Sequence, residues 1–325
     1  MAMTYARVGR SGLKVSRVGL GSWMTYGSSV DMSTAARCVH TALDAGIVFI
    51  DTADIYALGD AESMLGEILA ETRREDLVLA TKAFWPMSDN VNDRGLSRKH
   101  LFEAVHASLR RLRTDYIDLY QCHRYDAETP VEEVVRAMDD LVRQGKILYW
   151  GVSCWSAAQI VEATRIAGAA HAAAPISNQP PYNMFEREIE REIIPTAESE
   201  GLSQVVFCPL AQGLLTGKYQ EGQIPAGSRA AHEQYGRFLR PTLEEANLRR
   251  VEALQEVARD IGVPLSQLAL AWCLRQPNVA SVITGASRPQ QVLENVGAAD
   301  LELEPGVLAR IEAILDNAPG PPASP

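Results

Sequence analysis

The chain has 325 residues, 46% of them hydrophobic, and a formal net charge of −10 at pH 7. This length suits one large α/β barrel, and the acidic balance argues against nucleic acid or an anionic membrane as the main partner. No run of 18 apolar residues is present, and the first ten residues, which include Arg7 and Arg10, have no apolar signal core, so we expect neither membrane insertion nor secretion.

Short apolar runs alternate along the chain with amphipathic segments, which is the pattern of βα units. A small hairpin is predicted first, from residues 4–8 and 13–15. Strands are predicted at 16–20, 46–50, 77–81, 116–120, 149–152, 175–177, 204–207 and 279–283. Helices with apolar residues at three-to-four spacing are predicted at 61–70, 97–113, 131–144, 156–169 and 186–199, with others beginning near Thr242 and after Arg288.

This order of elements predicts a (β/α)8 TIM barrel whose N-terminal β-hairpin lies as a plug across one end. Residues 1–316 are predicted to form a single domain because no linker divides them, and the tail 317–325 is predicted to be disordered. The long loop after strand 7, from Phe207 to Thr242, starts at the active face of such a barrel and suits a lid.

Four titratable residues lie at the ends of three successive predicted strands. Asp51 and Tyr56 follow the second strand, Lys82 the third and His123 the fourth. The carboxyl ends of barrel strands converge on one face, which holds the active site in enzymes of this fold. Each residue alone has an ordinary alternative: a turn carboxylate, a packing tyrosine, a solvated lysine or a structural histidine. Their joint placement favours a proton-transfer site.

These four side chains suit the reduction of a carbonyl group. A phenol is a poor acid at neutral pH, and we expect the Lys82 ammonium to lower the pKa of Tyr56. Asp51 would hold Lys82 charged and in place, and His123 would donate a hydrogen bond to the carbonyl oxygen. Side chains cannot supply hydride, so a nicotinamide cofactor is implied.

The cofactor phosphate is predicted to lie after the last strand. No Gly-x-Gly-x-x-Gly fingerprint leads from a strand into a helix, and barrels place phosphates near the loops after strands seven and eight. There, Gly285 permits close approach of the backbone, Ser287 is a predicted helix cap and Arg288 is suited to a phosphate. An arginine at this position favours NADPH over NADH; the alternative is a plain cap with a solvated arginine.

The motifs together resemble the aldo-keto reductase superfamily. The segments concerned are Phe49-Ile50-Asp51-Thr52-Ala53-Asp54-Ile55-Tyr56, Ala80-Thr81-Lys82 and Leu119-Tyr120-Gln121-Cys122-His123. The likeness runs from about Tyr5 to Ile314. It implies that Asp51, Tyr56, Lys82 and His123 form the family's catalytic tetrad, with Tyr56 as the general acid.

Residues 19–23, 208–219 and 285–287 resemble in particular the branch that contains potassium-channel β subunits and their bacterial relatives. The resemblance implies that Ser153, Asn178 and Gln179 hold the nicotinamide carboxamide and that Phe207 stacks on the ring. The remaining residues implied at the NADPH/NADP+ site are Ser22, Trp23, Asp51, Cys208, Pro209, Leu210, Gln212, Gly213, Lys218, Arg229, Gly285, Ser287, Arg288, Gln291, Glu294 and Asn295.

Trp23 and Trp85 follow the first and third strands. Together with Tyr56 and His123 they are predicted to wall a pocket for a small aldehyde or ketone. Alternatively, the two tryptophans pack under the barrel rim. The five cysteines lack any metal-ligand or CxxC spacing, so we expect no metal site and reduced thiols in a cytoplasmic protein, with Cys122, Cys154 and Cys208 beside the site.

Two functions from different classes follow. The first is an NADPH-dependent reductase of aldehydes or ketones. The second is an NADP(H)-sensing β-type subunit that regulates a membrane channel. His123 stands where channel β subunits usually carry asparagine, which favours the reductase. A homo-oligomer, either a tetramer or a larger ring, is implied by analogy with the branch.

Overall fold

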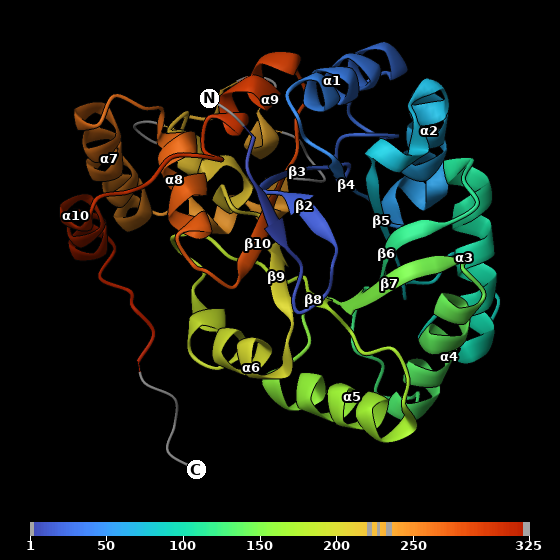
Figure 1. The fold of residues 1–325 in the computed structure, drawn as a ribbon. Coiled ribbons are helices and arrows are strands. Elements are labelled where there is room, and N and C mark those ends of the chain that lie inside the picture. Colours follow the sequence, from blue (N-terminus) through green and yellow to red (C-terminus); the bar gives the residue numbers. More distant parts are fainter. Residues whose placement is uncertain (1–2, 220–222, 226–227, 232–235, 321–325) are drawn as a thin grey trace.

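The computed structural model describes residues 3–219, 223–225, 228–231 and 236–320. Within them, parallel strands form a closed barrel in the order β10-β3-β4-β5-β6-β7-β8-β9. Helices surround the strands (Figure 1). The strands are β3 (Val18–Gly21), β4 (Phe49–Asp51), β5 (Val78–Ala83), β6 (Ile117–Cys122), β7 (Ile147–Val152), β8 (Ser177–Asn178), β9 (Ser203–Val206) and β10 (Val279–Thr284). The predicted TIM barrel is confirmed.

One helix follows each of the strands β3 to β8, and two follow each of β9 and β10. These helices are α1 (Met32–Asp44), α2 (Asp60–Ile68), α3 (Arg98–Leu112), α4 (Val131–Arg143), α5 (Ala157–Ala170), α6 (Ile193–Glu200), α7 (Glu245–Asp260), α8 (Leu265–Leu274), α9 (Pro289–Val296) and α10 (Pro305–Leu315). Helices α7 and α10 pack against each other at the side of α8 (Figure 1). None of the helices in the described ranges is long and apolar enough to cross a membrane.

The antiparallel hairpin of β1 (Tyr5–Arg7) and β2 (Lys14–Ser16) closes the amino-terminal end of the barrel. Val15 in β2 and Val8, directly after β1, are fully buried in one apolar cluster with residues of the barrel strands. Gly9 has a φ of +56°, and its N–H donates to Oγ of Ser203 at the start of β9. The predicted plug is therefore confirmed.

Several predicted boundaries are wrong. The strand predicted at 46–50 begins only at Phe49, and the strand predicted at 77–81 runs from Val78 to Ala83, so that Lys82 lies one residue before its end. The helix predicted at 186–199 begins at Ile193, because a 3-10 turn, η4 (Glu188–Glu190), precedes it.

The loop after β9 leaves the carboxyl end of the barrel at Phe207 and reaches α7 at Glu245. Its described parts contain the 3-10 turns η5 (Ala211–Thr216), η7 (Arg229–Ala231), η8 (Gly236–Phe238) and η9 (Arg240–Thr242). Leu214, Leu215 and Tyr219 are buried in the same apolar cluster as residues of α8. The first part of the loop therefore packs on the barrel. Of the tail predicted to be disordered, residues 321–325 lie outside the described residues.

Candidate active site

The barrel brings the four predicted catalytic residues to one mouth. Asp51 is the last residue of β4, and Tyr56 begins the turn η1 (Tyr56–Gly59) that follows. Lys82 lies next to the end of β5, and His123 directly follows β6, where its N–H donates to the carbonyl oxygen of Ala83 at 3.1 Å. All four side chains therefore start from carboxyl ends of adjacent parallel strands, where barrel enzymes do their chemistry.

Lys82 and Asp51 form an ion pair inside this mouth. Nζ of Lys82 lies 2.6 Å from Oδ1 of Asp51 and 2.7 Å from the carbonyl oxygen of Thr52. The Lys82 side chain has no solvent exposure. The ammonium group has three N–H donors, and these two acceptors leave one of them over.

Tyr56 and His123 lie against this pair. Their ring centroids are 5.8 Å apart, and the rings meet edge to face. Nζ of Lys82 lies 5.2 Å from the centroid of the Tyr56 ring. The Tyr56 hydroxyl makes no hydrogen bond to any residue that the structure describes. A phenol, an ammonium and an imidazole therefore converge, with the hydroxyl of Tyr56 left for a ligand.

The predicted net lowering of the pKa of Tyr56 is wrong for this arrangement. Burial raises the pKa of Tyr56 well above its usual value of 10.0, and the Asp51 carboxylate raises it further. Arg124 acts in the opposite direction. The main physical reason is that the phenol is buried, and the charge of Asp51, the partner of Lys82, adds to the effect of burial. Tyr56 is therefore held in the protonated form that a proton donor needs.

Burial also controls the charges of the other two groups. It lowers the pKa of His123 well below 6.5, and the positive charges of Lys82 and Arg124 act in the same direction. The imidazole is therefore neutral at pH 7, with a buried Nδ1 that has no partner among the described residues. Burial lowers the pKa of Lys82 too, while Asp51 opposes this shift. A neutral imidazole donates from one nitrogen only, which suits a hydrogen bond to a carbonyl oxygen.

Two residues of the site were not predicted from the sequence to be functional. Gln121 in β6 donates to Oδ2 of Asp51 at 3.5 Å, alongside Gln179, which donates to the same oxygen at 2.9 Å. Arg124 follows His123 and reaches the oxygen of Ser153. Gln121 lies two residues before His123, and Arg124 directly follows His123. Their positions next to a predicted strand end could have marked both as candidate site residues.

Strained backbone gathers at the same mouth. Positive φ angles occur at non-glycine residues of the loops that leave β3, β4, β7 and β9, namely Met24, Ala57, Leu58, Cys154, Cys208, Ala211 and Gln212. Such angles are uncommon for residues with a Cβ atom and persist where surrounding structure fixes them, often at functional sites. This clustering marks the carboxyl face independently of the titratable residues.

The residues assigned to the nicotinamide all lie on this face, but the three polar ones already have hydrogen-bond partners. Ser153 donates to the carbonyl oxygen of Gln179 at 2.8 Å. Asn178 bonds Gln204 and the N–H of Trp155, and it is fully buried. Phe207 follows β9 and is half-buried. Phe207 thus offers an aromatic surface at the rim, while the carboxamide contacts of the other three residues remain predictions.

The loop from Cys208 to Gly213 also fits a phosphate chain in one respect. Gly213 has a φ of +102°, and a Cβ atom there would lie 3.5 Å from Nζ of Lys218. The ammonium of Lys218 therefore lies over the turn. Pro209 and Leu210 lie in the same turn, and both Cys208 and Gln212 have interacting partners. Of Arg229 the structure describes the backbone in η7, and the side chain lies outside the described part.

At the predicted adenosine end, the expected cap is wrong. The residue at the N-cap of α9 is Arg288, followed by Pro289, and no side chain caps the helix. Ser287 instead bonds Oε1 of Gln291 through its N–H at 2.8 Å and its hydroxyl at 3.2 Å. Gly285, Ser287 and Arg288 are exposed, and Arg288 makes no ion pair with a described residue. An exposed unpaired arginine at a helix start fits an anionic phosphate.

Two further members of that set have structural contacts. Glu294 accepts a hydrogen bond from the hydroxyl of Ser266, and its carbonyl oxygen accepts one from Gln267. Asn295 is buried in α9. After the neighbouring strand β3, which pairs with β10, Ser22 donates to the hydroxyl of Thr52 at 2.8 Å, and Trp23 beside it is half-buried. Their contacts to a cofactor remain predictions.

Trp85 lies at the surface of the mouth. It is 38% exposed, and its ring centroid lies 6.3 Å from that of His123. The alternative that the tryptophans pack under the barrel rim is therefore wrong for Trp85. Among the three cysteines expected beside the site, Cys122 is fully buried and therefore not accessible, whereas Cys154 and Cys208 are half-buried.

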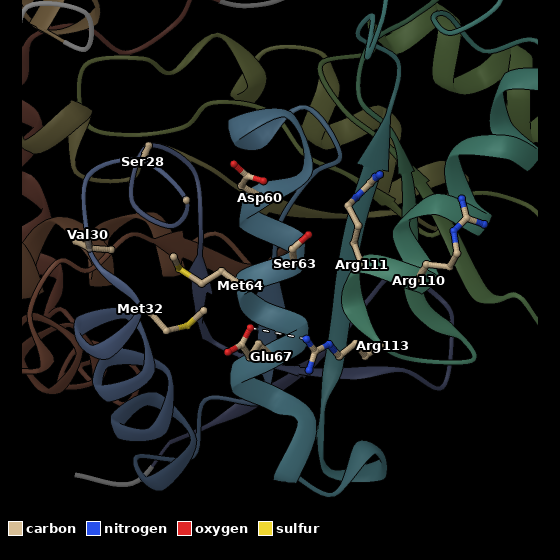
Figure 2. A pocket seen from close by; sticks show the side chains of 11 residues that line it. Ser28, Val30, Met32, Asp60, Ser63, Met64, Glu67, Arg110, Arg111 and Arg113 are labelled. Carbon is tan, nitrogen blue, oxygen red and sulfur yellow. Dashed lines mark ion pairs between the residues drawn. The ribbon is translucent and has the colours of Figure 1, made fainter.

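A shallow hollow of about 700 Å³ lies away from this mouth, on the outer side of α2. Figure 2 shows Met32 and Met64 on one side of that helix and Arg110 and Arg111 on the other. None of the four tetrad residues lines it. The hollow is therefore separate from the candidate active site.

Comparison with known proteins agrees with the geometry. The model of the aldo/keto reductase family matches residues 17–316. A probable voltage-gated potassium channel subunit beta from Oryza sativa subsp. japonica is 45% identical over 322 residues, which cover 98% of both chains. A probable subunit of the same name from Arabidopsis thaliana is 45% identical over 99% of both chains, and a putative one from Schizosaccharomyces pombe is 41% identical over 96% of this chain and 93% of that protein. These matches confirm the resemblance to the channel β-subunit branch. The chain belongs to the aldo/keto reductase family.

Proposed function

We propose that this protein reduces aldehydes or ketones to alcohols with NADPH as the reductant. Membership of the aldo/keto reductase family supports oxidoreductase chemistry, generally with NAD(P)H. The observation that carries the proposal is the convergence of a protonated Tyr56, a paired Lys82 and a neutral His123 at one barrel mouth. A carbonyl oxygen placed there meets a proton donor and a neutral hydrogen-bond donor together.

The proposed mechanism assigns one task to each side chain. The cofactor supplies hydride to the carbonyl carbon when it is bound. Tyr56 gives its hydroxyl proton to the carbonyl oxygen, which becomes the alcohol oxygen. Lys82, which Asp51 holds in place at 2.6 Å, stabilises the phenolate that remains on Tyr56. His123 donates a hydrogen bond that orients the carbonyl oxygen.

A preference for NADPH over NADH is proposed from Arg288. Its side chain is exposed at the start of α9, and no described carboxylate pairs with it. A guanidinium forks onto a phosphate, whereas the ribose hydroxyl of NADH offers no such charge. Replacing Arg288 by glutamine is expected to weaken NADPH binding and to leave NADH binding nearly unchanged.

A titration of the purified protein with each cofactor tests the proposal, followed by steady-state assays with 4-nitrobenzaldehyde and methylglyoxal. We expect tighter binding of NADPH than of NADH and consumption of NADPH with at least one carbonyl compound. Failure to bind either cofactor, or binding without turnover of any carbonyl compound, would contradict a reductase.

The second candidate is an NADP(H)-sensing β-type subunit of a membrane channel, because the relatives carry that name at 41–45% identity. Such a subunit need not turn over quickly. Cofactor that stays bound through gel filtration, together with turnover well below about 1 per second, would favour this candidate. Rapid turnover with free exchange of the cofactor would favour the reductase. A homo-oligomer is proposed for either function, and light scattering tests it.

A further inference from the structure

Arg124 lies at the rim of the active-site mouth, immediately after His123. Its NH1 donates to the carbonyl oxygen of His123 at 2.5 Å and lies 3.4 Å from Oγ of Ser153. Its Cζ atom lies 5.8 Å from the centroid of the Trp85 ring. The guanidinium is therefore placed between Trp85 and Ser153, with His123 directly behind it.

The charge of Arg124 is not neutralised by any described residue. Lys82, a second cation of the mouth, is paired with Asp51, whereas Arg124 forms no ion pair with a residue in the described ranges. Its Nε and NH2 make no hydrogen bond to these residues either. An arginine keeps its positive charge throughout the physiological pH range, so the rim carries an excess positive charge with free donors.

The same charge reaches the reacting groups. Burial and Asp51 raise the pKa of Tyr56, and Arg124 opposes them; burial and Lys82 lower the pKa of His123, and Arg124 adds to that effect. Arg124 is thus close enough to act on what is bound against Tyr56 and His123. Beside it, the exposed face of Trp85 offers an apolar wall for the body of a substrate.

A guanidinium with free N–H groups binds a carboxylate through parallel hydrogen bonds. We propose that Arg124 selects carbonyl substrates that also carry a carboxylate, such as formylbenzoates. This inference rests on the proposed reductase function, since Tyr56 and His123 must receive the carbonyl group. The aromatic ring of such a substrate spans Trp85, which places the carboxylate at Arg124 and the aldehyde at the tetrad.

The competing explanation is that Arg124 merely supports the loop after β6 through the carbonyl oxygen of His123. Loss of such support would affect every substrate alike. Loss of a carboxylate contact would affect only substrates with that charge. A pair of substrates that share size and shape but differ in charge therefore separates the two explanations.

The experiment compares 4-carboxybenzaldehyde with 4-nitrobenzaldehyde, a planar neutral analogue, by kcat/KM. We expect the wild type to prefer the carboxylate. We also expect Arg124→Gln to reduce the ratio of the two kcat/KM values by roughly 10- to 100-fold, mainly through KM of the carboxylate, as for loss of a charge-assisted hydrogen bond. Arg124→Lys is expected to restore part of the ratio. Arg136→Gln, which changes an exposed arginine of α4, is the matched control and is expected to leave the ratio unchanged.

A binding measurement separates this inference from the reductase proposal. Calorimetric titration with 4-(hydroxymethyl)benzoate and its neutral amide requires no turnover. Tighter binding of the benzoate to wild type, lost in Arg124→Gln, supports the inference even where no aldehyde is reduced. Equal binding of the two compounds, or an equal loss for both in the variant, overturns it, and reduction of 4-nitrobenzaldehyde would still support the reductase.

Discussion

Lys82 is an ammonium group without solvent exposure, and Asp51 is its partner inside the barrel. Breaking a buried ion pair leaves the other charge uncompensated, which typically costs about 3–5 kcal/mol. We therefore expect Lys82→Met to lower the free energy of unfolding by about that amount. Urea unfolding followed by circular dichroism measures it.

The double variant Asp51→Asn/Lys82→Met supplies the control. Removal of both charges abolishes the uncompensated carboxylate, so the double variant should be more stable than Lys82→Met alone. If the free energy of unfolding of the double variant falls by the sum of the decreases in the two single variants, the two residues are not energetically coupled.

His123 predicts a pH effect on stability. Burial lowers its pKa well below 6.5, so the folded chain binds fewer protons at this residue than the unfolded chain does. Stability contributed by the neutral histidine is therefore lost as the pH falls below about 6.5, by up to about 1.4 kcal/mol per pH unit. Asparagine does not titrate in this range, so His123→Asn does not lose this part of its stability as the pH falls. Unfolding measured from about pH 8 to 5 should show the variant gaining on the wild type only below about pH 6.5.

His100 and Asp54 also have shifted pKa values, so the wild-type curve alone is not diagnostic. These residues are present in both proteins, and they cancel in the difference between variant and wild type. A difference that stays constant down to pH 5 would mean that His123 is not buried in its neutral form.

The positions of the tetrad were predictable because the strand ends were readable from apolar runs. The direction in which the pKa of Tyr56 is shifted was not predictable, because it depends on how deeply packing buries the phenol and on the nearby charge of Asp51. Arg124 was missed for a similar reason. A sequence places it next to His123 but does not say that its guanidinium turns toward Ser153 and Trp85.

Helices α2 and α3 approach closely at Gly66. A Cβ atom there would lie 2.2 Å from the carbonyl oxygen of Arg111 and 2.8 Å from Cα of Leu112. Backbone atoms cannot move aside as a flexible side chain can, so α2 must shift. We expect Gly66→Ala to lower the free energy of unfolding by at least about 1–3 kcal/mol, as overpacking does.

Gly168 in α5 is the matched control, because a Cβ atom there meets nothing within 4 Å. Alanine is a better helix former than glycine by about 0.8–1.0 kcal/mol, so Gly168→Ala should be neutral or stabilising. Equal effects at the two glycines, compared by thermal unfolding, would contradict the packing of α2 on α3.

Helices were predictable where one face is polar. In α3 the apolar residues Leu101, Val105 and Leu109 are buried on one side, as their spacing indicates. All residues of α8 are buried, so the helix has no solvent-exposed polar face. Its sequence therefore lacks the amphipathic pattern, and its range was not predicted. The range of α1 was also not predicted, although Asp31 caps it and Ala35, Cys38, Val39 and Ala42 form its buried face.

The closed barrel explains why residues distant in sequence form one site. Each parallel strand delivers its carboxyl end to the same mouth, so Asp51 and Gln179 meet at 2.9 Å although 128 positions separate them. The number of βα units could be counted in the sequence. Eight such units predict a closed barrel, in which the carboxyl ends of the strands converge on one mouth. The path of the long loop after β9 was not predictable, because no regular pattern of apolar residues governs it.

The proposed role of Tyr56 as proton donor is tested most directly by NADPH consumption with 4-nitrobenzaldehyde, measured for wild type and Tyr56→Phe. Phenylalanine keeps the ring beside His123 and removes only the proton donor. We expect wild type to consume NADPH. We expect Tyr56→Phe to bind NADPH with nearly the same affinity but to lose at least about 100-fold in kcat, as for loss of a general acid. Turnover by Tyr56→Phe within a few-fold of wild type would contradict Tyr56 as the acid.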